Sequence, residues 1–135
     1  MRVFVDTSAF VSLVDRDDSD HRPAKRLLRD LARKRVGLVT STFVLDETLT
    51  LLRMHVSHAA AVMFGERLFS TRWCQLVEVD ESLRAEAWRL FVRYDDQRFS
   101  FTDCTSFALM RSMALSDAFS FDSDFSAAGF TQFPK

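Results

Sequence analysis

Short runs of β-branched and aromatic residues alternate with longer amphipathic segments along this chain. The runs at residues 3–5, 36–39, 75–79 and 118–121 predict buried strands, and the tail at 129–133 predicts a fifth strand at the edge of a sheet. Between them, apolar positions recur every three or four residues, which predicts helices from residue 7 to Val14 and over 22–35, 42–56, 58–71, 80–93 and 102–114.

Strands separated by helices of this length require crossover connections, so the pattern predicts an α/β fold. We expect three layers, α/β/α, around a central and mostly parallel sheet of four to five strands. The chain has 135 residues, shows no linker or internal repeat, and is expected to form one domain over 1–135. Trp73, Trp88 and most of the phenylalanines are expected in the core.

Five acidic residues occur where apolar or hydroxyl-bearing neighbours would favour another buried residue. They are Asp6 in VFVDTSAF, Glu47 in STFVLDETLTLL, Asp103 in SFTDCTSFALM, and Asp122 and Asp124 in AFSFDSDF. Asp6 and Asp122 each follow the last apolar residue of a predicted strand, and ligands of parallel sheets bind at that end of the strands.

The neighbours Asp46 and Glu47 separate on a helical wheel, because consecutive helical residues differ by about 100°. Asp46 falls on the polar arc and is expected in solvent. Glu47 falls at the edge of the apolar arc, beside Leu51, and is expected to turn inward or to extend from that edge to water.

Each remaining acid also has a purely local explanation. Asp103 follows Ser100 at the spacing of a capping box, although it shares the core-facing stripe with Phe107. Asp122 could close an Asx turn, and Asp6 could cap the helix that follows it. As a set, however, gathered carboxylates repel one another by roughly 4 kcal/mol per close pair, and a hard divalent cation such as Mg²⁺ or Mn²⁺ relieves this repulsion.

Composition narrows the alternatives. Two cysteines and three scattered histidines provide neither a disulfide framework nor a zinc site. The chain has no signal peptide or apolar membrane span, so we expect a cytoplasmic protein. Because the net charge of the chain is −1, any nucleic acid that it binds must meet a local basic patch. The predicted helix 22–35 offers one, since its basic residues share one arc that could follow phosphates or could simply be a solvated face. These residues are Arg22, Lys25, Arg26, Arg29 and Arg33.

The four acidic segments, in this order and spacing, resemble those of PIN-domain ribonucleases, and specifically of VapC-type toxins from toxin–antitoxin pairs. The resemblance covers essentially the whole chain. It implies a metal-dependent endoribonuclease with Asp6, Glu47, Asp103 and Asp122 as the catalytic acids.

The same resemblance implies that Asp6 and Asp103 bind Mg²⁺ or Mn²⁺ directly, that Asp122 and the additional acid Asp124 complete the metal site, and that Thr7 or Ser8 supports Asp6. It further implies an RNA substrate, a homodimer, and an antitoxin protein that blocks the site.

Three alternatives are less consistent with the sequence. A phosphatase of the haloacid-dehalogenase type would carry an acid at position 8, which is Ser8 here. A response-regulator receiver would need paired acids at the first strand and a late lysine, and Lys135 is the only late lysine. An RNA- or protein-binding module without turnover would not need its acids intact.

Overall fold

The computed structural model describes residues 1–70 and 72–135, and within them five parallel strands form one sheet in the order β3-β2-β1-β4-β5. The elements in chain order are β1 (Arg2–Val5), α1 (Thr7–Val14), α2 (His21–Arg33), β2 (Gly37–Ser41), α3 (Thr42–His55), α4 (His58–Ser70), β3 (Cys74–Val77), α5 (Glu81–Arg93), α6 (Phe101–Ser112), β4 (Asp117–Phe119), α7 (Asp124–Ala127) and β5 (Thr131–Phe133).

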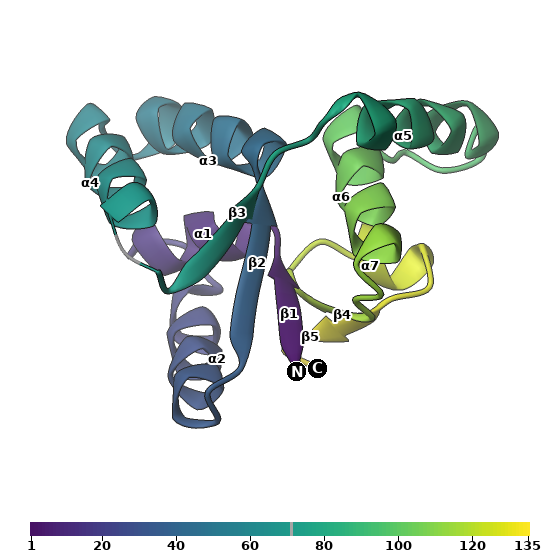
Figure 1. Ribbon diagram of the computed structural model, residues 1–135. Helices are drawn as coiled ribbons and strands as arrows, with labels where there is room; N and C mark the ends of the chain where they lie inside the picture. The colour runs from purple at the N-terminus through teal and green to yellow at the C-terminus, as the bar shows by residue number, and fades with distance from the viewer. Residues whose placement is uncertain (71) are drawn as a thin grey trace.

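Helices cover both faces of this sheet, which gives the predicted three layers. Figure 1 shows α1, α2 and α4 on one side of the sheet and α5, α6 and α7 on the other, with α3 near one end of the strands. The central strand β1 pairs with β2 and β4, and its Phe4 lies in register with Val39 and Ala118. Strands buried on both faces are typical of parallel sheets, and Val3, Phe4 and Val5 are almost completely buried.

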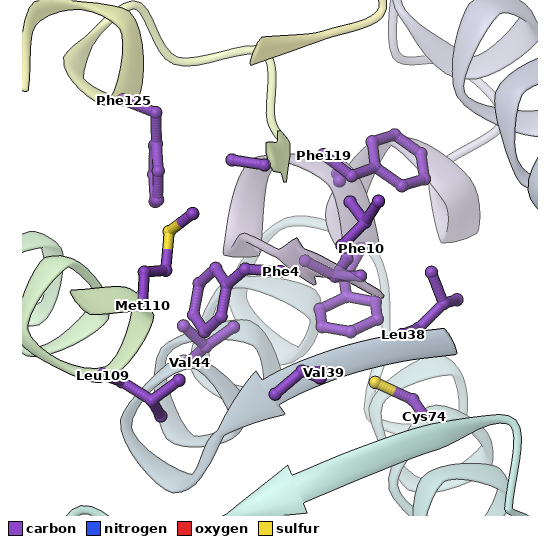
Figure 2. Packing of buried hydrophobic residues seen from close by; sticks show 14 of the residues in the cluster. Phe4, Phe10, Leu38, Val39, Val44, Cys74, Leu109, Met110, Phe119 and Phe125 are labelled. Atoms are coloured by element: carbon purple, nitrogen blue, oxygen red, sulfur yellow. The ribbon is translucent and has the colours of Figure 1, made fainter. Parts of the chain in front are cut away.

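Phenylalanine supplies much of the core. Phe4 of β1 stacks on Phe125 of α7 with ring centroids 6.1 Å apart, and Phe125 meets Phe107 of α6 edge to face at 5.1 Å. Figure 2 shows Phe4, Met110 and Phe125 gathered on one side of the sheet. These contacts fasten the segment after β4 against α6, which is how two of the acidic segments meet.

Side-chain caps explain why helices begin directly after strands. Asp6 follows β1, Ser41 ends β2 and Asp80 follows β3, and each accepts a hydrogen bond from a main-chain N–H in the first turn of the next helix. Thr40 Oγ1 also donates to the Val5 carbonyl at 2.9 Å, which ties the carboxyl ends of β1 and β2 together.

The predicted strands and helices are confirmed, with differences at their ends. The strand predicted at 118–121 ends at Phe119, because the N–H groups of Phe121 and Asp122 donate to the hydroxyls of Ser8 and Ser120 rather than to a strand. The last predicted residue of the helix at 58–71 lies outside the described residues. The sequence pattern did not predict α7, which has four residues.

One expectation about the core is wrong. Trp88 is 58% exposed on α5, next to the exposed Phe91, and Phe69 on α4 is 65% exposed. Trp73 is half-buried and packs against Phe10. Helical spacing identifies an apolar stripe, but it does not distinguish a stripe that meets the core from one left at the surface. No helix in the described ranges has the length and apolar character needed to cross a membrane.

Candidate metal centre at the carboxyl ends of the strands

Asp6 is both a helix cap and a member of the acidic site. It follows β1, is 4% exposed, and its side chain accepts the Ser8 N–H at the start of α1. Burial raises the pKa of this carboxyl to about 6, although the hydrogen bonds it accepts act in the opposite direction. The alternatives of cap and site residue are therefore not exclusive here.

Two serine hydroxyls orient Asp6 through the same oxygen. Ser8 Oγ donates to Asp6 Oδ2 at 2.9 Å, and Ser120 Oγ donates to it at 3.1 Å. The two hydroxyls then accept the main-chain N–H groups of Phe121 and Asp122, at 2.9 and 3.0 Å. Because the Ser8 N–H and both serine hydroxyls donate to Oδ2 of Asp6, the other carboxylate oxygen remains available to a ligand.

Of the two predicted supporting hydroxyls, Ser8 contacts Asp6 and Thr7 does not. The Thr7 hydroxyl is buried without a hydrogen-bond partner in the described part of the chain. Sequence reasoning missed Ser120, which is 1% exposed and links β1 to the segment after β4. Its only local signal is a serine two residues before Asp122, and this spacing alone does not identify a contact with Asp6.

Asp103 also combines two roles. Ser100 caps α6 by accepting the Asp103 N–H at 3.0 Å, and Asp103 Oδ2 accepts the Ser100 N–H at 3.0 Å, so the predicted capping box is present. Even so, Asp103 is only 8% exposed, which agrees with the inward direction expected from its shared stripe with Phe107.

Asp122 and Asp124 lie on the turn that leads from β4 into α7. Asp122 Oδ1 accepts the Asp124 N–H at 3.1 Å, which is the Asx turn considered from the sequence. Both residues are half-buried. Since Asp124 is in the first turn of α7, its position depends on Phe125, which anchors this helix in the core.

Three of these acids converge. Asp103, Asp122 and Asp124 each present a carboxylate oxygen, and the three oxygens lie within 4.8 Å of one another. Asp6 is close enough for its charge to raise the pKa of Asp103. The structure thus brings together Asp6, Asp103, Asp122 and Asp124. These residues come from three segments that are far apart in the sequence.

Burial and like charge both disfavour ionisation in this cluster. Burial is the largest cause that raises the pKa of Asp103 to about 8, with smaller contributions from Asp124, Asp6 and Asp122. Burial and the Asp124 carboxylate also raise the pKa of Asp122. The ion pairs of the described residues, Arg33–Asp30 and Arg89–Glu86, involve none of these acids.

Glu47 lies on α3, one turn after Phe43 and on the same face. Phe43 contacts Phe101 at the start of α6, with ring centroids 6.1 Å apart, so this face of α3 is turned towards the end of α6 that carries Asp103. Glu47 is half-buried whereas Asp46 is exposed, as the helical wheel predicts. Among the described residues, no hydrogen bond or ion pair engages the Glu47 carboxylate.

The basic residues predicted on one arc of α2 are exposed. Arg22, Lys25, Arg26, Arg29 and Arg33 all face solvent, and Arg33 pairs with Asp30. However, α2 leads into the amino end of β2, and Gly37 at the start of β2 donates to the Met1 carbonyl. The end of α2 that carries Arg29 and Arg33 therefore lies by the opposite end of the sheet from the acids (Figure 1).

The acidic residues fit a hard divalent cation. Their donors are all carboxylate oxygens, which Mg²⁺ and Mn²⁺ prefer, and the described part of the chain places no basic side chain among them. Asp6 and Asp103 each direct one oxygen to main-chain or hydroxyl donors, which leaves a second oxygen for a ligand. The described histidines and cysteines contribute no ligand to this cluster.

The chain is similar to known proteins in sequence and in fold. Residues 3–131 match the PIN domain family. The chain is 42% identical over 130 residues to the 23S rRNA-specific endonuclease VapC20 of Mycobacterium tuberculosis, which covers 96% of both chains.

Solved structures show the same similarity. The crystal structure of Mycobacterium tuberculosis VapC20, described as a sarcin-ricin loop cleaving toxin, superimposes with a TM-score of 0.88 at 40% identity over 96% of each chain. The structure of VapBC2 from Rickettsia felis bound to promoter DNA gives a TM-score of 0.73 at 12% identity, covering 98% of this chain and 97% of that one, which shows the shared fold.

Proposed function

The chain belongs to the PIN domain family, and on this premise we propose that it is a metal-dependent endoribonuclease that acts as the toxin of a toxin–antitoxin pair. One observation carries the proposal. Four buried or half-buried aspartates meet at the carboxyl ends of the strands, and within the described residues no basic side chain neutralises them. A site of this kind favours a bound cation over an empty pocket.

We assign the cation to Asp6, Asp103, Asp122 and Asp124. Mg²⁺ or Mn²⁺ bound there would lower the pKa of water and neutralise the charge that develops on a phosphodiester. The protein itself orients the ligand groups. Ser8 and Ser120 fix the Asp6 carboxylate, and the capping box fixes Asp103, so neither side chain must be reordered during the reaction.

Hydrolysis also needs a group that accepts a proton from the attacking water. We propose Glu47 or Asp122 for this role. Glu47 is half-buried on the face of α3 turned towards α6 and engages no described partner, so its carboxylate is free to take the proton. As water attacks the phosphorus, its proton passes to this carboxylate, the phosphodiester P–O bond breaks, and the leaving oxygen takes a proton from solvent.

The proposed substrate is RNA, and the first RNA to test is the sarcin–ricin loop of 23S ribosomal RNA. The support is the activity described for VapC20, which shares 42% of its residues with this chain over nearly its full length. The exposed basic face of α2 supports a role in attracting RNA, although a substrate cut at the acids must extend along the protein to reach Arg29 and Arg33.

Family membership supports further proposals about the protein's partners. We propose a cognate antitoxin protein that covers the acidic site, and a homodimer. We further propose that the cation is Mg²⁺ or Mn²⁺, that the protein is cytoplasmic, and that residues 1–135 form a single PIN-like domain.

The test is cleavage by the purified chain of a synthetic sarcin–ricin loop RNA and of an unrelated hairpin, with Mg²⁺, Mn²⁺ or a chelator. We expect metal-dependent cleavage that is lost in Asp6→Asn and Asp103→Asn. Asp46→Asn is the matched control, because it removes the same negative charge from an exposed residue outside the site. Undiminished cleavage by the Asp6 and Asp103 variants would refute the site assignment. Binding without cleavage in the unaltered chain would favour a module that binds RNA without turnover.

A further inference from the structure

The outer edge of β3 is a surface that the nuclease site does not use. In the described part of the chain, β3 pairs with β2 on one side and has no strand on the other. Part of its main-chain N–H and C=O groups therefore point away from the sheet. Proteins often protect such edges with charged residues, proline or a bulge, yet β3 reads Cys-Gln-Leu-Val and contains none of these.

An apolar groove of about 920 Å³ begins at β3 and extends past the amino end of β2 to the first residue of β1. Cys74, Gln75 and Leu76 of β3 form one side of it, and aliphatic and aromatic side chains from α2, α4, β2 and the residues that flank these elements form much of the rest. Phe69 lies in this lining and is 65% exposed, which leaves a large apolar surface in contact with water.

Three arginines, and no acidic residue, contribute to the lining of the groove: Arg2, Arg35 and Arg72. None of them has an ion-pair partner among the described residues. Gly37 makes room for one of them, because a Cβ at this position would lie 3.1 Å from Arg2 Cγ. The groove therefore combines an apolar lining with guanidinium groups that form no ion pair, next to the free edge of a strand. Guanidinium groups bind carboxylates through paired hydrogen bonds.

We infer that the outer edge of β3 binds an extended segment of another protein, in which apolar side chains reach into the groove and acidic side chains meet Arg35 and Arg72. The segment adds a strand to the sheet through main-chain hydrogen bonds. This inference goes beyond the nuclease proposal and does not depend on it, because the groove lies by the amino ends of the strands.

Two other occupants fit the surface less well. RNA would find cations and the aromatic side chains of Phe69 and Trp73 here, but RNA has no peptide groups that could continue the sheet along the free edge of β3. A second copy of this chain that paired edge to edge through its own β3 would bring no acidic residue to these arginines, because β3 carries none.

A peptide-display library tests the inference. Random 12-residue peptides are selected on the full chain, with counter-selection on the double variant Phe69→Glu, Arg72→Glu, whose two sites are exposed and need not disturb folding. We expect the enriched peptides to alternate apolar with acidic residues. No enrichment, or enriched peptides without acidic residues, would overturn the inference.

The enriched peptide is then synthesised and its affinity measured by fluorescence anisotropy. We expect at least a tenfold loss of affinity in Arg72→Glu, in Phe69→Glu, and when alternate peptide nitrogens are methylated to remove their N–H donors. Arg93→Glu is the matched control, because Arg93 is an exposed residue of α5 outside the groove, and it should leave the affinity unchanged. Circular dichroism establishes that each variant is folded.

Two further measurements distinguish the other occupants. An oligouridine ten nucleotides long that displaces the peptide, and itself loses affinity in Arg72→Glu, would identify the groove as an RNA surface. Light scattering that shows dissociation into monomers in Phe69→Glu would identify it as a contact between copies. Either result would overturn the assignment to a partner segment.

Discussion

The Ser120 hydroxyl donates to Asp6 Oδ2 at 3.1 Å across a sequence separation of 114 residues. The same hydroxyl accepts the Asp122 N–H at 3.0 Å, so one buried serine sets the distance between two acidic segments. Ser8 makes the equivalent pair of contacts, to Asp6 and to the Phe121 N–H. These two serines hold the site in place before any ligand arrives.

Ser120→Ala should reduce RNA cleavage by roughly 10- to 100-fold, which is the usual cost of losing a group that orients a metal ligand. It should also lower the free energy of unfolding by about 1–2 kcal/mol, because the Asp122 N–H and Asp6 Oδ2 each lose a buried partner. Ser116→Ala is the control, since Ser116 is exposed. Unchanged cleavage in Ser120→Ala would show that Ser8 alone suffices.

Asp103→Asn and Asp103→Ala should separate the two roles of this residue. Both variants should lose cleavage, because neither carries the charge that binds the cation. The asparagine oxygen still accepts the Ser100 N–H, however, so urea unfolding should find the alanine variant less stable than the asparagine variant by about 1 kcal/mol. Equal stabilities would mean that the capping box contributes little to α6.

Glu47→Gln and Asp46→Asn form a matched pair, since the two residues are neighbours on α3 and each variant removes one negative charge. We expect the turnover rate to fall strongly in Glu47→Gln and to stay unchanged in Asp46→Asn, because only Glu47 is turned inward. If the Glu47→Gln variant retained full turnover, Asp122 would be the better candidate for the proton acceptor.

The metal-free protein should lose stability as the pH rises from about 4 to about 8. Folding raises the pKa of Asp6 from 3.8 to about 6 and that of Asp103 to about 8, so the folded state binds more protons than the unfolded state in this interval. The stabilising contribution is complete below the unfolded pKa and is lost as each carboxyl ionises. For Asp6 alone this contribution is roughly 3 kcal/mol.

Thermal unfolding with a chelator, scanned across this pH range, measures the effect. Mg²⁺ should restore the melting temperature most at the upper end of the range, where the carboxylates are ionised and bind it best. Asp103→Asn should flatten the metal-free profile. A melting temperature that rises with pH in the chelated protein would contradict the burial of these acids.

Arg26→Ala and Arg29→Ala together should flatten the salt dependence of RNA affinity by about 1.4 in log–log slope, if each arginine neutralises one phosphate of a single strand. Arg84→Ala and Arg93→Ala remove the same charge from α5, where both residues are exposed, and serve as controls. Filter binding at several salt concentrations provides the slopes. Equal slopes in the two double variants would indicate a merely solvated face on α2.

Local patterns were sufficient for much of this fold and part of its site. The wheel separated Glu47 from Asp46, and strand ends placed Asp6 near the segment that carries Asp122. The role of Ser120 was not predictable, because its contact with Asp6 exists only after β1 and β4 pair in the sheet. Trp88 was misplaced for the opposite reason, since an apolar residue with helical spacing looks the same whether it meets the core or solvent.

The capping box of α6 means that a mutation of Asp103 affects activity and stability together. If the chain is the toxin proposed above, its host gains when the protein loses activity, and a single changed codon at Asp103 would abolish that activity. Because the same carboxylate holds the first turn of α6, most such changes would also weaken the fold and expose the chain to proteolysis. The inactive copies would then be less abundant in the cell than the intact protein.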